Sequence, residues 1–392
     1  MSKLNELIQK LCPDGVQYRK LAECCTLEKG NTPIQKAVPG EYPLVVTTEE
    51  RKSCNSYQFE KPTVCIPLIS SRGHGVASLN SLFYQEGKFA LGNILCGVTP
   101  INSDELSAKF LFYYLNHKKD ALIVPLMRGG ANVSLTVDSL KRVKIPVPPI
   151  SVQNEIARIF DKFDSLEATL LAELAARKKQ YEYYRDKLLN LDASTRQMRL
   201  GDICSLITKG TTPKSYAKTG VNFIKTEAFD GTKINPEKLS YVDDETHTTF
   251  LKRSILEEND ILITIAGATI GKCAMVPKEI LPANTNQALA IIRLAKGNSP
   301  KYVMYLLQSD LMKQYMQKNI KGSAQPNLSL KQLNDFVIPL PSLSVQEHLV
   351  SVLDHFEDIC SDFNIGLPAE IAVRQKQYAY YRDKLLTFKQ LS

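Results

Sequence analysis

Basic and polar side chains that could contact DNA gather in loop-like stretches of this chain. Lysine and arginine are the usual partners of phosphate oxygens, and Asn, Gln, Ser and Thr can read base edges. In the second half the candidates are Lys209, Thr211, Lys214, Lys218, Lys225, Lys272, Asn284, Asn286 and Gln287. In the first half the Gly-flanked stretch ISSRGHG supplies Ser70, Ser71, Arg72 and His74. A single basic residue is most often only solvated, so the group as a whole predicts the nucleic-acid surface.

The distribution of charge supports that prediction. The 392 residues carry a net charge of +8, which alone is a mild indication of a polyanionic partner. Residues 1–144 carry +5 and residues 193–337 carry +6, whereas residues 145–192 and 338–392 carry −1 and −2. The positive charge therefore belongs to two blocks, and these are the candidate DNA-binding parts.

Sequence motifs for catalysis are missing. Gly267 to Lys272 resembles a phosphate-binding loop, but it is one residue too short and Cys273 stands where Ser or Thr is needed. There is no Asp/Asn-Pro-Pro-Tyr/Phe motif for amino-methylation and no dinucleotide-binding glycine motif. His348 and His355 lack companions for a metal site, and nine scattered cysteines do not suggest disulfides. We expect no catalysis, no cofactor and no metal on this chain alone.

One segment of the chain occurs twice. RKKQYEYYRDKLL at 177–189 and RQKQYAYYRDKLL at 374–386 share 11 of 13 residues. Upstream stand IPVPPISVQNEIARIFDKF at 145–163 and IPLPSLSVQEHLVSVLDHF at 338–356, a shift of 193 residues. Since this spacing is far too long for a solenoid repeat, it indicates two copies of a domain with a helical appendage.

The repeated segments have the apolar spacing of long helices. Their predicted contact stripe contains Leu170, Leu174, Tyr181, Tyr184 and Leu188 in the first copy, and Ile371, Tyr378, Tyr381 and Leu385 in the second. Gly366 and Pro368 lie in an insertion of the second copy, so we expect that helix to be interrupted and to restart near Pro368. If the two copies pair antiparallel, they form a rigid spacer.

Each half precedes its helix with a globular domain. KLAECCTLEKGNTP at 20–33 matches RLGDICSLITKGTTP at 199–213 and predicts a strand that ends in a turn. Short β-like runs such as YPLVV and DILITIAG follow, then helical windows at 107–119 and 299–316. We predict an α+β (mixed α/β) fold with two pseudo-symmetric globular domains and two long helical segments packed antiparallel. The predicted boundaries are 1–150 for the first domain, 151–197 for its helical spacer, 198–343 for the second domain and 344–392 for its spacer.

Together these features resemble the specificity subunit of type I restriction–modification systems. The resemblance rests on two diverged domains that each end in Ile-Pro-x-Pro, a Ser-Val-Gln helix and the Tyr-rich helix, and on the opening LCPDGVQYRKL. It implies that each domain is a target recognition domain for one half of a bipartite site in double-stranded DNA. The helices would set the separation of the halves and dock two methyltransferase subunits, with two motor-nuclease subunits completing the enzyme. S-adenosylmethionine, ATP and Mg²⁺ would be bound by those partners.

Two alternatives remain open: a self-contained enzyme, which the missing motifs disfavour, and a helical scaffold or adaptor without sequence-specific DNA recognition. The tyrosines of the repeated helices favour core packing plus a partner-facing surface over base stacking. No apolar stretch is long enough to span a membrane, and the start MSKLNELIQK has no apolar signal core. We expect a cytoplasmic protein.

Overall fold

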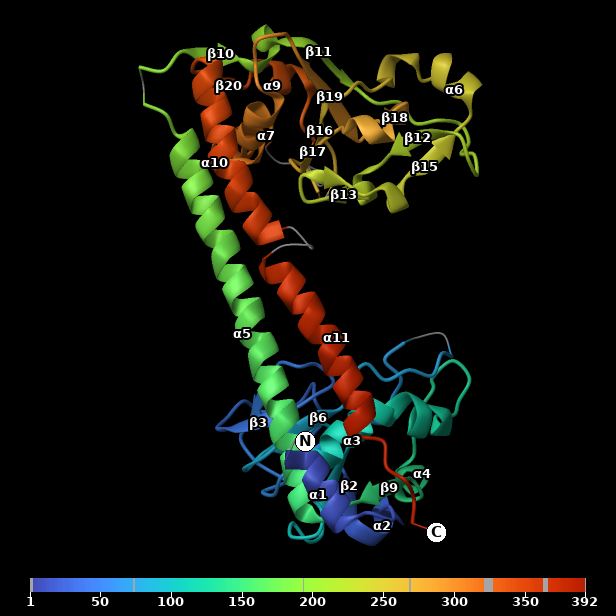
Figure 1. Cartoon of the computed structure of the whole chain (residues 1–392). Helices are drawn as coiled ribbons and strands as arrows, with labels where there is room; N and C mark the ends of the chain where they lie inside the picture. Colours follow the sequence, from blue (N-terminus) through green and yellow to red (C-terminus); the bar gives the residue numbers. More distant parts are fainter. Residues whose placement is uncertain are drawn as a thin grey trace. The chain divides into compact units, whose positions relative to one another are not determined.

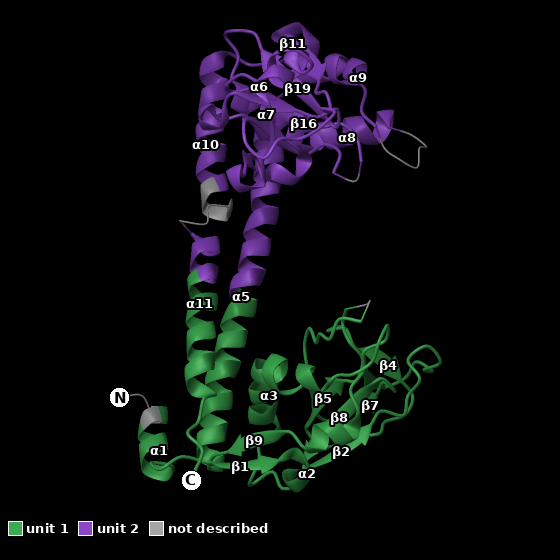
Figure 2. Ribbon diagram, turned by 90° about the vertical axis from the view of Figure 1, so that its right-hand side faces the viewer, with its two compact units in different colours: residues 1–169, 373–392 green, residues 170–372 purple. Residues whose placement is uncertain are grey.

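The computed structural model describes residues 3–72, 75–192, 194–267, 269–320, 327–361 and 366–391. The chain divides into two compact units, coloured separately in Figure 2. Unit 1 contains residues 1–169 and 373–392, and unit 2 contains residues 170–372. Each unit is therefore built from one globular part and segments of the repeated helices.

Unit 1 begins with a short helix and continues through a β-rich region to a helical exit. Its elements in chain order are α1 (Lys3–Leu11), β1 (Gln17–Lys20), α2 (Leu21–Cys24), β2 (Cys25–Lys29), β3 (Tyr42–Val45), β4 (Lys52–Cys54), β5 (Thr63–Pro67), β6 (Phe83–Gln85), β7 (Ala90–Leu91), β8 (Leu95–Pro100), α3 (Ala108–Leu122), α4 (Val137–Lys141), β9 (Lys144–Val147) and the first half of α5 (Ile150–Leu189). The last part of α11 (Leu367–Leu385) completes the unit (Figure 1).

Unit 2 follows the same plan. Its elements are β10 (Gln197–Arg199), β11 (Cys204–Lys209), β12 (Val221–Ile224), β13 (Phe229–Asp230), β14 (Lys233–Ile234), β15 (Ser240–Val242), α6 (Asp244–Thr248), β16 (Ile261–Thr264), β17 (Cys273–Met275), β18 (Ala283–Thr285), β19 (Leu289–Leu294), α7 (Pro300–Gln308), α8 (Asp310–Asn319), α9 (Leu330–Asp335), β20 (Val337–Pro339) and α10 (Leu343–Ser361). The predicted helix over 299–316 is two helices, because Ser309 adopts an extended conformation and α8 restarts directly after it.

Each sheet of unit 1 has a counterpart in unit 2, which has the two-stranded sheet β13-β14 in addition. Unit 1 has strand orders β2-β8-β5-β6 and β4-β3-β7, and unit 2 has β11-β19-β16-β17 and β15-β12-β18. In the smaller sheets β3 runs parallel to β7, and β12 runs parallel to β18. A short antiparallel pair closes each unit before its long helix, β1 with β9 and β10 with β20. The predicted mixed α/β architecture in two similar copies is confirmed.

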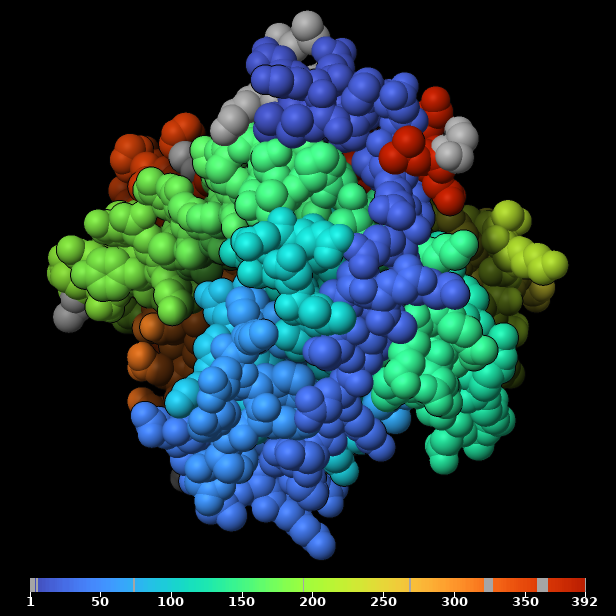
Figure 3. Space-filling model, turned by 90° about the horizontal axis from the view of Figure 1, so that it is seen from below, coloured from blue at the N-terminus to red at the C-terminus, as the bar shows by residue number. Residues whose placement is uncertain are grey.

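Unit 1 is also closed by its own chain end. The Val16 amide donates to the Lys389 carbonyl at 2.8 Å, and the Leu391 amide donates to the Val16 carbonyl at 2.9 Å. Figure 3 shows the red C-terminal residues beside the dark blue N-terminal segment. The tail after the second helix thus adds to the first domain, which explains how segments more than 370 residues apart in the sequence belong to one unit.

The helices pack antiparallel within each unit. In unit 1 the Phe163 ring stacks on Tyr378 and on Tyr381 of α11, with centroids 5.3 and 5.8 Å apart, and Gln375 donates to Glu167 one turn further along α5. In unit 2 the Tyr184 ring stacks on Phe356 of α10. The second copy is interrupted as predicted: α11 begins at Leu367 with Pro368 in its first turn, and Gly366 has a φ of 80°.

In the part of the chain that the structure describes, no helix is long and apolar enough to cross a membrane. The same residues contain no group of three or more His, Cys, Asp and Glu side chains placed to hold a metal ion. Of the nine cysteines, the eight whose side chains the structure describes all carry free thiols.

Candidate nucleic-acid interface

Main-chain hydrogen bonds gather four loops of unit 2 at one edge of its sheets. The Gly210 amide donates to Leu289, the Thr211 amide donates to Thr285, and the Ile265 amide donates to Ala288, all at 2.9–3.0 Å. β12 and β18 are parallel and paired at Ile224 and Thr285, so the residues that follow both strands emerge side by side. We call residues 209–213, 225–226, 265–267, 269–272 and 286–288 the loop edge of unit 2.

Unit 1 has an edge of the same construction. The Gly30 amide donates to Leu95 at 2.9 Å, the Thr32 amide donates to Leu91 at 3.1 Å, and the Leu68 amide donates to Ile94 at 2.8 Å. Residues 29–33, 46–49, 68–72 and 92–94 form the loop edge of unit 1. Leu68 therefore corresponds to Ile265, so residues 69–72 of ISSRGHG follow β5 as the ITIAGATIGK turn follows β16.

One glycine in each edge is required by close packing of main chains. A Cβ atom on Gly30 would lie 2.2 Å from the Gly92 carbonyl oxygen, and one on Gly210 would lie 2.1 Å from the Asn286 carbonyl oxygen. These are the glycines matched in the two sequence repeats. In both halves a proline, Pro33 or Pro213, follows three residues after this glycine and marks the loop edge.

Six of the residues predicted to bind DNA come together on the loop edge of unit 2. Lys209, Lys272 and Gln287 are exposed, whereas Thr211, Lys225 and Asn286 are half-buried. The Asn286 side-chain oxygen accepts from the Ala288 amide at 3.1 Å, which holds the turn and leaves its NH₂ group as a possible donor. Lysine charge and amide donors thus share one surface.

Lys214 and Lys218 lie in the loop between Gly210 and β12 and are both exposed. The Lys214 ammonium lies 5.8 Å from the centroid of the exposed Phe250 ring. The Lys225 ammonium lies 4.9 Å from the centroid of Tyr216. Since ammonium groups over aromatic faces are attracted to the ring electrons, these lysines are held on aromatic side chains and extend the basic surface beyond the loop edge.

Asn284 lies in a different environment from the other candidates. Its side chain is fully buried, and its NH₂ group donates to the Leu251 carbonyl at 3.1 Å. Its carbonyl oxygen is 2.6 Å from Nδ1 of His247 on α6. Asn284 has no exposed atoms for a direct contact, because β18 places it inside the unit, and its role is to hold His247.

Two of the predicted DNA-binding residues of unit 1 form hydrogen bonds within their own loop. The Ser70 hydroxyl accepts from the amides of Arg72 and Ser78 and donates to the Val76 carbonyl at 2.5 Å. The Ser71 hydroxyl accepts from the Asn80 amide at 3.0 Å. Arg72 is exposed, and His74 lies outside the described residues. The two serines shape the loop, and Arg72 is its exposed cation.

Ser70 and Ser71 also line a polar cleft of about 520 Å³ on the same edge. The other lining residues are Thr47, Thr48, Glu49, Pro67, Ile69, Asn80, Ser81 and Phe83. The contribution of residues 47–49 could not be read from the sequence, because that segment follows β3 in the part where the halves have diverged. The parallel pairing of β3 and β7 brings it to the edge.

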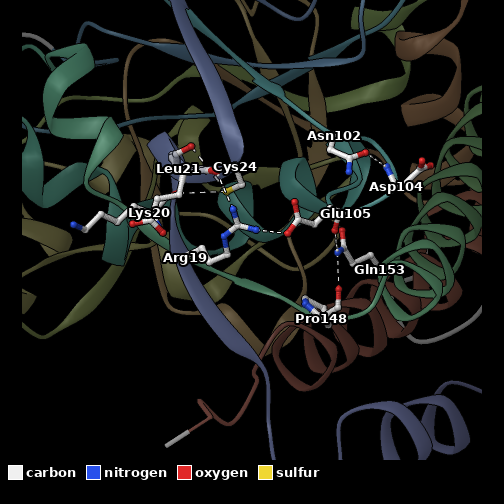
Figure 4. A network of polar contacts seen from close by, with 10 residues as sticks. Arg19, Lys20, Leu21, Cys24, Asn102, Asp104, Glu105, Pro148 and Gln153 are labelled. Atoms are coloured by element: carbon white, nitrogen blue, oxygen red, sulfur yellow. Dashed lines mark hydrogen bonds and ion pairs between the residues drawn. The ribbon is translucent and has the colours of Figure 1, made fainter.

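A buried glutamine fastens each globular part to its long helix. In unit 1 the Gln153 side chain on α5 accepts from the Ser107 amide at 2.8 Å. It donates to the carbonyls of Glu105 and Pro148 (Figure 4). In unit 2 the Gln346 side chain on α10 accepts from the Ser299 amide at 3.0 Å and donates to the Pro341 carbonyl. These are the glutamines of the repeated Ser-Val-Gln. A glutamine that recurs among apolar positions in both repeats is the sequence feature that could have predicted this attachment.

A tyrosine and a lysine reinforce the attachment in unit 1. The Tyr113 hydroxyl on α3 lies 2.8 Å from carboxylate oxygens of both Asp161 and Asp164 on α5, and it can donate to one of them at a time. The Lys109 ammonium is 2.9 Å from Asp161. Burial and then the two acceptor carboxylates raise the pKa of Tyr113.

Unit 2 repeats this arrangement with equivalent residues. The Tyr305 hydroxyl on α7 lies 2.5 Å from Asp354 and 2.8 Å from Glu357 on α10, and the Lys301 ammonium is 2.6 Å from Asp354. Burial, then the neighbouring carboxylates, raise the pKa of Tyr305. In both units, equivalent polar contacts thus attach the globular part to its long helix.

The predicted helical stripe is only partly buried. Leu170, Ile371 and Leu385 are buried, whereas Leu174, Tyr181, Leu188 and Tyr378 are half-buried. Tyr184 and Tyr381 are exposed on one side although they stack on Phe356 and Phe163. The first turns of α5 instead bury Val152, Ile156 and Phe160 against the globular part of unit 1. The stripe therefore divides into a domain-facing part and a helix-facing part.

One tyrosine of each copy packs on very little. Tyr183 and Tyr380 are each 61% exposed and touch chiefly the adjacent tyrosine edge-on. Equivalent exposed aromatic side chains in both copies are typical of a protein-binding surface.

Comparison with known proteins places this geometry in context. The family model described as "Type I restriction modification DNA specificity domain" matches residues 13–176 and 195–373. The EcoR124I/EcoR124II specificity subunit of Escherichia coli is 28% identical over 74% of this chain and 73% of its own length. A putative type I restriction enzyme specificity subunit of Haemophilus influenzae is 29% identical over 95% of this chain and 96% of its own length.

Solved structures show the same fold. The S subunit of a type I restriction-modification system from M. genitalium aligns over 95% of both chains with a TM-score of 0.53 and 18% identity. A chain from a structural study of the assembly and conformational transition of the type I R-M system aligns over 96% of this chain and 98% of its own length, with a TM-score of 0.59 and 17% identity.

Proposed function

Because this chain belongs to the family of type I restriction–modification DNA specificity proteins, we propose that it is the subunit that selects the DNA sequence for such an enzyme. Each unit would read one half of a bipartite site in double-stranded DNA through its loop edge. The two edges carry different side chains on the same main-chain frame, so the two half-sites would differ in sequence.

The observation that supports this proposal is the contrast between the loop edges and the contacts that attach each globular part to its long helix. Lys109, Tyr113 and Gln153 of unit 1 recur as Lys301, Tyr305 and Gln346 in unit 2, with equivalent contacts. Apart from the Lys-Gly-x-Thr-Pro segment at 29–33 and 209–213, the side chains on the loop edges do not recur. A protein that recognises two different sequences with one architecture needs this division.

The proposal includes a spacing role for the helices. α5 has 40 residues, which corresponds to about 60 Å of helix axis at 1.5 Å per residue. Inserting or deleting four residues within 165–176 changes its length by about 6 Å, close to two base-pair steps of about 3.4 Å. Mapping of methylated adenines should then show recognition sites whose spacer is altered while both half-sites stay the same. An unchanged spacer contradicts this role.

The chemistry would belong to the partners. Two methyltransferase subunits would dock on the helices, at surfaces that include Tyr183 in unit 2 and Tyr380 in unit 1. Two motor-nuclease subunits would complete the restriction enzyme in the cytoplasm. The partners would bind S-adenosylmethionine, ATP and Mg²⁺, and this chain would be a non-catalytic subunit. The proposal is supported by family membership and by the exposed tyrosines of both copies.

The deciding experiment compares DNA binding and modification with and without a co-expressed methyltransferase partner. Methylated-adenine sequencing in a host that carries the partner should reveal one bipartite motif only when this chain is present. Identical methylation without it overturns the proposal. A scaffold without sequence recognition, the alternative function, predicts partner binding without any preferred DNA sequence.

A further inference from the structure

The polar cleft of unit 1 differs chemically from the rest of the proposed DNA surface. Among the described residues that line it, none is Lys or Arg, and Glu49 is the one charged side chain. A carboxylate on a surface that meets phosphates costs free energy by repulsion unless it accepts a hydrogen bond from the ligand. The cleft is therefore unsuited to phosphate.

The loop that carries Glu49 is held in place from behind. The Arg51 guanidinium donates to the Glu49 carbonyl at 3.0 Å and to the Gln85 side-chain oxygen at 3.1 Å. The same group lies 5.2 Å from the ring centroid of Phe83, which forms one wall of the cleft. Main-chain and ring contacts fix the loop, so the Glu49 carboxylate projects from a preorganised support.

Two of the five hydroxyl groups that line the cleft donate their protons inside the protein. Thr48 donates to the Glu50 carbonyl at 3.2 Å, and Ser70 donates to the Val76 carbonyl. Within the described part of the chain, no group donates to the Glu49 carboxylate. The Glu49 carboxylate is therefore an acceptor that a ligand would meet in the cleft, beside hydroxyl groups and the Asn80 side chain, which can donate or accept.

We propose that Glu49 is a specificity-determining residue that accepts a hydrogen bond from the exocyclic amino group of one base in the half-site read by unit 1. This inference rests on the proposed function. In the major groove the amino groups belong to cytosine N4 and adenine N6, and carboxylate side chains pair with such donors. Guanine and thymine offer only acceptors there, so the carboxylate rejects them.

The test uses the full chain assembled with its methyltransferase partner and a library of duplexes randomised in both half-sites. Selection with the wild-type complex defines the preferred base at each position, and the same selection is repeated with Glu49→Gln, Glu49→Ala and Glu50→Gln. Glu50 is the matched control, because it is exposed, adjacent and equally charged but does not line the cleft. All variants change exposed residues, and their thermal melting is compared with wild type.

At one position of one half-site, wild type should prefer a base with an amino group, and Glu49→Ala should reduce that preference by about 5-fold or more. The other half-site should be unchanged in every variant, and Glu50→Gln should match wild type. Adenine or cytosine at that position identifies which amino group the cleft reads. Base preferences that are the same for Glu49→Ala and Glu50→Gln overturn the inference while leaving the proposed function intact. A wild-type complex without sequence preference overturns the proposed function itself.

Discussion

The buried Gln153 side chain is expected to be one of the strongest attachments between the globular part of unit 1 and its helix. Replacing it with Leu keeps a similar volume but removes three hydrogen bonds, to the Ser107 amide and to the carbonyls of Glu105 and Pro148. Leaving a buried polar group unpaired costs about 1–3 kcal/mol. Because the partners are partly buried, we take the lower end for each and expect Gln153→Leu to destabilise unit 1 by about 3 kcal/mol.

The second copy provides the matched comparison. Gln346 is equally buried but makes two such bonds, to the Ser299 amide and the Pro341 carbonyl, so Gln346→Leu should destabilise unit 2 by about 2 kcal/mol. Hydrogen exchange of the amides in α3 and α7 measures the two units separately. Each substitution should accelerate exchange only in its own unit.

A third variant tests the direction of the hydrogen bonds. Gln153→Glu keeps the shape but places a carboxylate oxygen against two carbonyl oxygens, so it should destabilise unit 1 more than Leu does at neutral pH. Protonation restores a donor, so the loss should diminish as the pH falls. If Gln153→Leu costs less than 1 kcal/mol, or Gln346→Leu costs more than Gln153→Leu, the reasoning from unsatisfied partners is wrong.

Four further outcomes are expected. Tyr305 has a folded-state pKa above its ordinary value of 10.0, so its contribution to stability is complete below pH 10 and is lost as the pH rises above 10. In urea titrations, the free energy of unfolding of the wild type should therefore decline above pH 10, and Tyr305→Phe should make that decline less steep. Gly210→Ala places a Cβ 2.1 Å from the Asn286 carbonyl oxygen and should lower the free energy of unfolding by about 1–3 kcal/mol. DNA sequence selection should weaken only at the half-site that unit 2 reads. An unchanged melting temperature contradicts the close approach of the two main chains. Lys272→Ala and Arg72→Ala should weaken DNA binding and reduce the slope of log K against log salt by about one each, and an unchanged slope removes the residue from the phosphate contacts. Tyr183→Ala and Tyr380→Ala should lower affinity for the methyltransferase partner by about 1 kcal/mol or more without altering melting, whereas pull-down at wild-type strength excludes them from the interface.

Local patterns in the sequence were enough to predict much of the fold. The matched Gly30 and Gly210 predicted strand ends, and Pro368 predicted the restart of the second helix. Ser309 showed no such signal, since a serine inside a helical window is common, and its extended conformation depends on burial between α7 and α8. Local propensity determines where chain elements can end, whereas tertiary contacts determine which of those ends are used.

The candidate site was harder to predict from the sequence, because the position of each side chain depends on strand pairing. Lys225 and Asn286 were predicted separately, and the parallel pairing of β12 and β18 brings them to one edge. Asn284 lies within β18, whose three residues are all buried, whereas Asn286 follows the end of that strand and is half-buried. The end of β18 therefore separates the two roles, and nothing in the diverged segment fixes that end from sequence alone.

The different construction of the two regions explains why one region repeats and the other varies. The loop edges are formed by main-chain hydrogen bonds such as Gly30 to Leu95 and Gly210 to Leu289, which require a glycine but place no demand on neighbouring side chains. Those side chains can diverge without cost to the fold. The attachments to the helices depend on particular groups, an amide at Gln153 or Gln346 and a hydroxyl at Tyr113 or Tyr305, and few substitutions reproduce their contacts. New base preferences can therefore arise at the edges while the domain stays attached to its helix in the same way.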